Sequence, residues 1–246
     1  MCKLRIWIFT LWVLSASGCG AETITIAAED AWYPFSGMNN GKIEGYSVDV
    51  VRAAFAAVKI DVKFEPIPYA RCLHLVKTGQ LLGCFNTTRT SLMEPDYLWT
   101  RKPMFTITPT IYSRSDSKER DLTISDLEGK RVIVTYEYEY GEAFDTDKKI
   151  IRDESPTDVS AFRKLLAGRA DYVISYGKIT AYLLRNYSRE FSGKIVAVGN
   201  LNIKEDVYTV FSKTYPDSAR YMELYNQGFD IISKNRTLAT IEKKWN

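Results

Sequence analysis

The residues best suited to chemistry lie in the stretch from Thr135 to Tyr140, which alternates tyrosine with glutamate. Phenol rings beside carboxylates can stack on a ring or a sugar, or hold a cation. The same alternation also fits the end of a strand with one buried face. We therefore expect Tyr136 and Tyr138 to contact a ligand, with a plain strand end as the alternative.

Signals for catalysis or metal binding are weak by comparison. The only histidine, His74, falls in a predicted amphipathic helix, where a surface or packing role is expected. The sequence has no Ser-His-Asp set, no glycine loop that would cradle phosphate and no Cys/His metal spacing. We expect a binding protein rather than an enzyme, with no cofactor and no metal. Were it an enzyme, Glu29 or Glu137 would act as acid or base.

The N-terminus has the three parts of a secretory signal. Lys3 and Arg5 precede an apolar run over 6–14, and small residues follow up to Ala21. The run is too short for a bilayer, which needs about 20 residues. We expect residues 1–21 to be a cleaved signal peptide and the mature protein to be periplasmic. Lipidation at Cys19, which would anchor the chain to a membrane, is the alternative.

Size and charge limit the remaining classes of function. The roughly 225 residues left after processing suffice for one large or two modest domains. The formal net charge is +3, and loss of Lys3 and Arg5 would leave +1. No basic stripe stands out, so we expect no nucleic-acid partner. We expect a soluble monomer.

Two cysteines remain after processing, Cys72 and Cys84, in a compartment that favours disulfides. A helix over 69–78 followed by a strand over 81–86 would bring the two sulfur atoms to similar heights. We expect a disulfide, with two buried free thiols as the alternative.

The pattern of apolar residues repeats a strand–helix rhythm twice, which is typical of α/β lobes with a parallel sheet. The first run has strands over 23–28, 61–64 and 81–86 with helices over 49–58 and 69–78. The second has strands over 131–135 and 171–174 with helices over 157–166 and 180–186. Extended stretches over 106–114 and 207–212 would cross between the lobes, and two helical segments end the chain.

Five segments carry a resemblance to a known family. They are Trp32–Phe35, Gly45–Val50, Leu127–Val132, Ala167–Asp171 and Ile241–Trp245. In order and spacing they resemble family 3 of the bacterial extracellular solute-binding proteins, which serve polar amino-acid importers. The resemblance implies an α/β, two-lobed periplasmic binding protein fold with two hinge crossings and an interlobe cleft. We expect residues 22–110 with 207–246 to form one lobe and residues 111–206 the other.

The resemblance also implies which residues face the ligand. Glu29 and Trp32 would face the ligand from the loop after the first strand, and Tyr69 would form a second aromatic wall. Asn86 and Thr88 follow the strand over 81–86, and sites in open α/β sheets lie beyond the carboxyl ends of strands.

Two positions depart from the family's pattern. Counted without gaps, Met93 stands where the family has its carboxylate-binding arginine, and Tyr176 stands where it has the acid for the amino group. Arg89, four residues before Met93, would bind the same anion or else be a solvated loop residue. We therefore expect a small polar or ring-containing solute rather than a standard α-amino acid.

The resemblance implies delivery of this solute to an ABC-type importer through an inner-membrane permease. The alternatives are a sensing module for a membrane receptor and, less favoured, a cleft enzyme of the dehydratase-like group.

Overall fold

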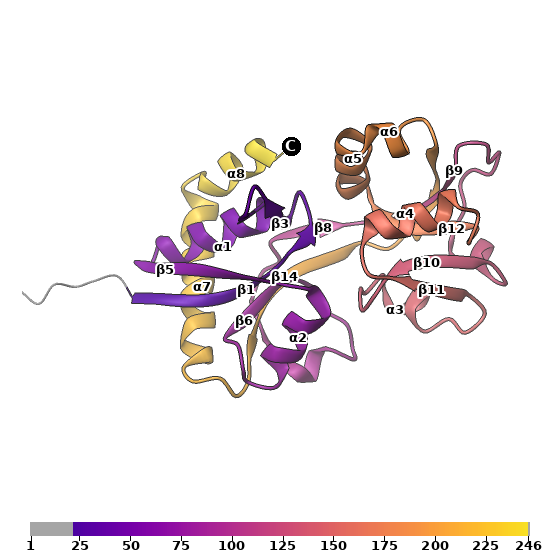
Figure 1. The fold of residues 1–246 in the computed structure, drawn as a ribbon. Helices are drawn as coiled ribbons and strands as arrows, with labels where there is room; N and C mark the ends of the chain where they lie inside the picture. Colours follow the sequence, from indigo (N-terminus) through magenta and orange to yellow (C-terminus); the bar gives the residue numbers. More distant parts are fainter. Residues whose placement is uncertain (1–21, 246) are drawn as a thin grey trace, which may run out of the picture.

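A computed structural model describes residues 22–245. The signal peptide predicted over 1–21, with its alternative of lipidation at Cys19, lies outside the described residues. Figure 1 shows two bodies of mixed helix and strand, joined by extended segments that run between them. We refer to them as the first and second lobes.

The first lobe contains both ends of the described chain. Its strands are β1 (Glu22–Glu29), β2 (Ala31–Trp32), β3 (Ser36–Asn39), β4 (Lys42–Glu44), β5 (Ile60–Ile67), β6 (Gly83–Thr88), β7 (Tyr97–Trp99), β8 (Phe105–Ile107) and β14 (Glu205–Ser212). Its helices are α1 (Tyr46–Ala56), α2 (Tyr69–Lys77), α7 (Ser218–Lys234) and α8 (Thr237–Trp245), with a 3-10 turn at Glu94–Asp96.

The second lobe is built on one five-stranded sheet in the order β11-β10-β12-β9-β13. Its strands are β9 (Pro109–Arg114), β10 (Arg131–Thr135), β11 (Ile151–Ser155), β12 (Tyr172–Tyr176) and β13 (Ile195–Asn200). Its helices are α3 (Glu142–Asp145), α4 (Asp158–Leu166), α5 (Gly177–Asn186) and α6 (Ser188–Phe191), with a 3-10 turn at Ile124–Leu127.

The predicted elements are present, with one correction to the first lobe. Only β1 and β5 pair in parallel there, whereas β6 pairs antiparallel with β14. The sequence rhythm suggested a parallel sheet because it omits β14, which returns to the first lobe more than 100 residues after β6. β14 also pairs with β7 and β8.

The chain changes lobe twice, as the two-lobed fold requires. The first change lies between β8 and β9, and the second lies between β13 and β14. The second crossing therefore precedes β14, which belongs to the first lobe along its whole length. The domain limits 22–110 with 207–246 and 111–206 stay a prediction.

The stretch after β10 differs from the alternative reading of a plain strand end. The strand ends at Thr135, and the chain then turns, with Glu137 in the left-handed region at φ 60°. The buried phenol oxygen of Tyr140 accepts a hydrogen bond from the Thr135 amide at 2.8 Å. This contact closes the turn, so the Tyr/Glu alternation is not a plain strand end.

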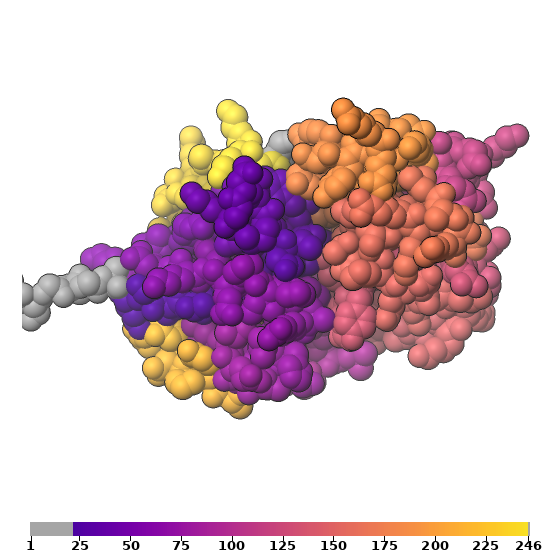
Figure 2. Space-filling model, viewed as in Figure 1, coloured from indigo at the N-terminus to yellow at the C-terminus, as the bar shows by residue number. Residues whose placement is uncertain are grey.

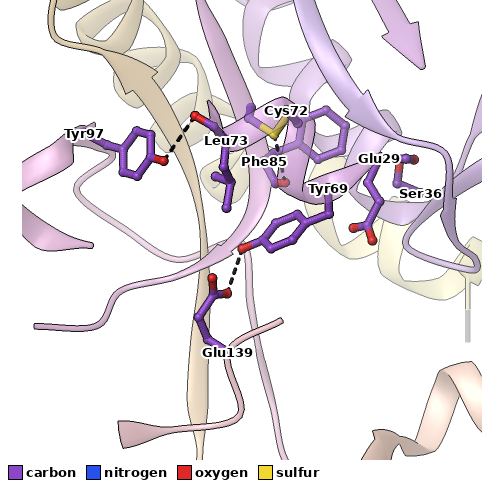
Figure 3. Close-up of a disulfide and its surroundings, with 9 residues drawn as sticks. Glu29, Ser36, Tyr69, Cys72, Leu73, Phe85, Tyr97 and Glu139 are labelled. Carbon is purple, nitrogen blue, oxygen red and sulfur yellow. Dashed lines mark hydrogen bonds between the residues drawn. A yellow bond between two sulfur atoms is a disulfide. The ribbon is translucent and has the colours of Figure 1, made fainter. Parts of the chain in front are cut away.

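A disulfide links α2 to β6. Cys72 and Cys84 are both fully buried, and their Cα atoms lie 6.2 Å apart. The predicted pairing is therefore present in the structure (Figure 3).

Helix α1 lies between the first-lobe sheet and the C-terminal helices. Val50, Val51, Ala54 and Phe55 form its buried face, at the 3.6-residue spacing that the sequence predicted. Gly228 in α7 allows the two helices to touch, because a Cβ atom there would lie 1.8 Å from the Ala54 carbonyl oxygen.

Candidate functional site

A small cavity lies where the two lobes meet, and we call it the interlobe cavity. Its lining comes from both lobes: Glu29, Trp32, Tyr69, Asn86, Thr88, Ile107, Tyr138, Glu139 and Tyr176. Its volume is about 10 Å³, which is at most the room of one water molecule. Figure 2 shows the surfaces of the two lobes in contact along a seam. The lobes are thus closed on each other, and side chains fill the space between them.

Glu29 ends strand β1 and is only 3% exposed. Its carboxyl accepts a hydrogen bond from the phenol of Tyr138, which reaches across from the second lobe. Burial raises the pKa of Glu29 to about 8; the Tyr138 bond partly offsets the rise, and nearby Asp158 adds to it. At neutral pH the Glu29 carboxyl is therefore mostly protonated in this closed state.

Glu139 makes the matching contact in the opposite direction. Its carboxyl accepts hydrogen bonds from the Tyr69 phenol at 2.7 Å and from the Thr88 hydroxyl at 3.3 Å, both on the first lobe. Figure 3 shows Tyr69 extended toward Glu139, with Glu29 on the same side of the first lobe. The residue keeps some exposed surface, but protein atoms surround its carboxyl, and this burial raises its pKa to about 8.

Aromatic rings enclose the two carboxyls. The Tyr138 ring lies edge-on to Trp32 and to Tyr69, with centroids 6.1 Å and 5.3 Å apart. Tyr176 packs edge-on to Trp32 at 5.6 Å, stacks on Tyr140 at 5.9 Å and donates its hydroxyl to the Glu139 carbonyl at 3.1 Å. Tyr138 thus lies in the middle of an aromatic box, in contact with Trp32, Tyr69 and Tyr140.

Two lining residues keep buried polar atoms without a hydrogen bond. The indole nitrogen of Trp32 has no partner, and neither polar atom of the Asn86 amide makes a hydrogen bond of normal geometry. Asn86 still lies close enough to lower the pKa of Glu29 slightly. Its backbone is left-handed, at φ 72°. An unpaired buried polar group costs free energy, so a hydrogen-bonding group that entered the cavity would be stabilised by the Trp32 indole or the Asn86 amide.

Asp158, at the start of α4 in the second lobe, lies close enough to Glu29 to raise the pKa of that carboxyl. It is 3% exposed, accepts a hydrogen bond from Ser175 at 2.5 Å and has a second oxygen without a partner. Burial raises its pKa to about 6. Several carboxyl groups in and around the cavity are therefore buried in surroundings of low polarity.

Seven of the nine ligand-facing residues expected from sequence line the cavity: Glu29, Trp32, Tyr69, Asn86, Thr88, Tyr138 and Tyr176. Tyr136 does not; its ring is 50% exposed and lines an outer groove of about 580 Å³ at the cavity's edge. Their ligand contacts stay predictions.

Arg89 also lies outside the cavity. Its guanidinium is bound to the carboxyl of Glu94 and lies over the Trp99 ring, 5.6 Å from the centroid. Met93 packs against the cluster around the disulfide. Neither position presents a positive charge to the cavity.

The sequence reading missed Glu139 and Asp158 as parts of the site. Glu139 lies in the Tyr/Glu stretch over 135–140, and the expected ligand contact of that stretch was the signal that could have identified it. Asp158 follows Thr157, whose side chain caps α4, and an acid at a helix start is usually read as helix-stabilising.

Other classes of site find no support within residues 22–245. His74 is exposed on α2. No group of three or more potential metal-binding side chains occurs in that part of the chain. None of its helices is both long and apolar enough to cross a bilayer.

Comparisons with known proteins agree on one family. The family model described as bacterial extracellular solute-binding proteins, family 3, matches residues 24–246. A probable amino-acid-binding protein of Bacillus subtilis (strain 168), YxeM, is 23% identical over 247 residues, covering 95% of this chain and 90% of that protein.

Two solved structures are similar in fold. One is a histidine kinase sensor domain with similarity to periplasmic binding proteins, with a TM-score of 0.80 and 22% identity, over 91% of this chain and 95% of that one. The other is the arginine-, lysine-, histidine-binding protein ArtJ of Geobacillus stearothermophilus, with a TM-score of 0.76 and 20% identity, over the same shares.

Proposed function

Because the chain belongs to family 3 of the bacterial extracellular solute-binding proteins, we propose that it captures a small polar or ring-containing solute between its lobes. The family implies a location outside the cytoplasm. The captured solute would be delivered to an ABC-type importer through an inner-membrane permease. We propose binding without chemical conversion of the solute.

One observation carries this proposal: both lobes contribute polar groups to a single enclosed site, and some of those groups lack partners. Trp32 and Asn86, on the first lobe, have buried polar atoms free to bond a ligand. Tyr138, Glu139 and Tyr176 reach the same point from the second lobe. A solute that touches both lobes stabilises their closure, which is how such proteins retain it.

Entry of a solute requires the lobes to part, because the interlobe cavity holds at most one water. The two crossings, between β8 and β9 and between β13 and β14, are the segments about which the lobes would rotate. The contacts of Tyr138 with Glu29 and of Tyr69 with Glu139 would break in this movement.

A thermal-shift screen of the processed protein tests the proposal, because a ligand that binds only the native state raises the unfolding midpoint. The panel contains amino acids, organic acids, amines and oligosaccharides. We expect at least one compound to raise the midpoint, and Trp32→Phe, which removes the indole N–H but keeps a ring, to reduce that shift. A panel without any shift would contradict capture of a small solute.

A sensing role is the second candidate, since the similar histidine kinase sensor domain has the same fold. Delivery and sensing would use the same cavity, so a measurement of ligand binding does not distinguish the two roles, but a measurement in cells does. In cells that lack this protein, unchanged uptake of the solute together with a lost transcriptional response to it would favour sensing.

A further inference from the structure

We infer that the interlobe cavity takes an organic cation without a carboxylate, an amine or guanidinium whose charged group replaces the Tyr138 phenol at Glu29. The inference rests on the proposed binding function and names the chemical class of the solute. It would exclude the standard amino acids, each of which brings a carboxylate into the same space.

The first ground is the charge of the lining. Glu29 and Glu139 both line the cavity, and no lysine, arginine or histidine is among its described lining residues. The groups that act on Glu29 from neighbouring elements are Asp30, Asp158, Tyr138 and Asn86, and those that act on Glu139 include Asp145, Tyr69 and Thr88. All of these are acidic or neutral. A buried cation would be stabilised here by ionisation of a neighbouring carboxyl, whereas a buried anion would find no positive charge among these groups.

The second ground is the position of three cations on neighbouring surfaces, none of which lines the cavity. Arg89 is bound to Glu94 outside the cavity. Arg152 lines a neighbouring groove and donates to the Phe144 and Asp147 carbonyls at 2.8 Å and 3.1 Å. Lys178 lines a different groove, on the Phe35 side of the molecule. A ligand carboxylate would thus enter the cavity without a charged partner, which is unfavourable for a desolvated anion.

The third ground is the aromatic box. Trp32, Tyr69 and Tyr176 present ring surfaces or edges to the space that Tyr138 fills. Ring faces attract a desolvated cation, and Trp does so most strongly. The unpaired Asn86 carbonyl oxygen can accept a hydrogen bond from an ammonium or guanidinium N–H. Cation, carboxyl and rings are therefore complementary in this space.

The number of protons released on binding follows from the protonation of Glu29 and Glu139 in the empty cavity. Burial keeps the pKa of Glu29 and of Glu139 at about 8, so both are largely protonated at pH 7. A cation beside Glu29 favours the ionised carboxyl. Binding then forms a carboxylate–cation pair, and the proton leaves to solvent. Up to one proton is released for each carboxyl that ionises.

Matched pairs of compounds that differ only in the carboxylate test the inference. Agmatine is compared with arginine, cadaverine with lysine, and phenethylamine with phenylalanine, by calorimetry at pH 7 in two buffers of different ionisation enthalpy. We expect at least one amine to bind at least tenfold more tightly than its amino acid, with release of protons.

The outcomes separate the two proposals. An amino acid that binds as tightly as its amine overturns the inference but leaves solute capture intact. Tight binding of a neutral sugar or a dicarboxylate, with none of the amines bound, does the same. If neither these compounds nor the wider thermal-shift panel binds, both proposals fail.

Variants locate the charge contact. Glu29→Gln should weaken amine binding at least tenfold and lower the number of protons released, a readout that a packing role would not change. Glu139→Gln provides a second, independent variant of the same kind. Glu65→Gln, an exposed glutamate on β5, is the matched control and should bind as the parent does. Parent-like affinity and proton release in both cavity variants would overturn the inference.

Discussion

The Tyr138 phenol, on the second lobe, donates a hydrogen bond to the Glu29 carboxyl at the end of β1 in the first lobe. Tyr69 and Glu139 make the reciprocal contact across the same cavity at 2.7 Å. The closed state is thus held by the protein's own phenols and carboxyls at the place where a solute is proposed to bind. A solute that bound Glu29, as proposed, would therefore compete with the Tyr138 phenol for that carboxyl.

Replacing Tyr138 by Phe should relieve this competition. The phenyl ring keeps the contacts with Trp32 and Tyr69, while the bond to Glu29 is lost. A neutral hydrogen bond contributes about 0.5–1.5 kcal/mol, so we expect a cleft ligand to bind roughly 2- to 10-fold more tightly. Calorimetry with any amine from the matched pairs measures the change. Tyr136→Phe, at the exposed neighbouring ring, is the control, and equal or weaker binding by Tyr138→Phe would refute the competition.

Raising the pH should open the empty protein. The carboxyls of Glu29 and Glu139 bond across the lobe boundary, and burial raises their pKa values to about 8 from 4.5. The closed state therefore binds more protons than a hydrated one between about pH 4 and 8. Its stability is greatest at low pH within this range and falls as pH rises, by at most about 1.4 kcal/mol per unit per carboxyl.

Small-angle scattering at pH 5.5 and 8.5 measures this opening. We expect a larger radius of gyration and a lower unfolding midpoint at pH 8.5, with a smaller pH dependence in Glu29→Gln. The pKa of Glu22 is lowered to about 2, so its protonation changes the stability only at pH values below this range. A midpoint that rises from pH 5.5 to 8.5 would contradict the burial of protonated carboxyls.

Reducing the disulfide should destabilise the first lobe. Cys72 and Cys84 are separated by 12 residues, and closing a loop of this length stabilises a fold by about 3 kcal/mol. Chemical denaturation with and without dithiothreitol gives the difference. The double variant Cys72→Ala/Cys84→Ala is the control, because its midpoint should not respond to the reductant. Two free thiols titrated in unfolded, untreated protein would mean that the bridge does not form.

The contact between α1 and α7 should tolerate no side chain at position 228. A Cβ atom on Gly228 would lie 1.8 Å from the Ala54 carbonyl oxygen, so Gly228→Ala must push the helices apart. We expect a loss of about 3 kcal/mol, measured by chemical denaturation. Gly177→Ala is the matched control, since nothing lies within 4 Å of a Cβ there. Equal stability of the two variants would show that α7 moves without cost.

Arg89→Ala tests the anion-binding role that the sequence suggested. With its guanidinium bound to Glu94 outside the cavity, we expect amine affinity to change less than twofold. If the ligand carries an anionic group held by Arg89, the loss would be roughly tenfold or more. Calorimetry on the parent and the variant distinguishes the two results.

Much of the architecture was predictable because its signals are local. Helical spacing on Val50, Val51, Ala54 and Phe55 identified the buried face of α1. The disulfide followed from the heights of Cys72 and Cys84 on adjacent elements, 12 residues apart. Family motifs spread along the chain identified the two-lobed fold. The same resemblance placed Glu29 near the cavity, and the end of a strand placed Asn86 and Thr88 there.

Only the tertiary structure decided what the cavity contains. Tyr138 and Glu29 are 109 residues apart, and Tyr69 and Glu139 are 70 apart; no periodicity specifies which side chains meet across two lobes. An alternating pattern gives the faces of a strand, but the strand ends at Thr135 and the chain turns there, with the Thr135 amide donating to the Tyr140 phenol. The protonation of Glu29 likewise depends on closure, because only the packed lobes exclude the water that would otherwise solvate its charge.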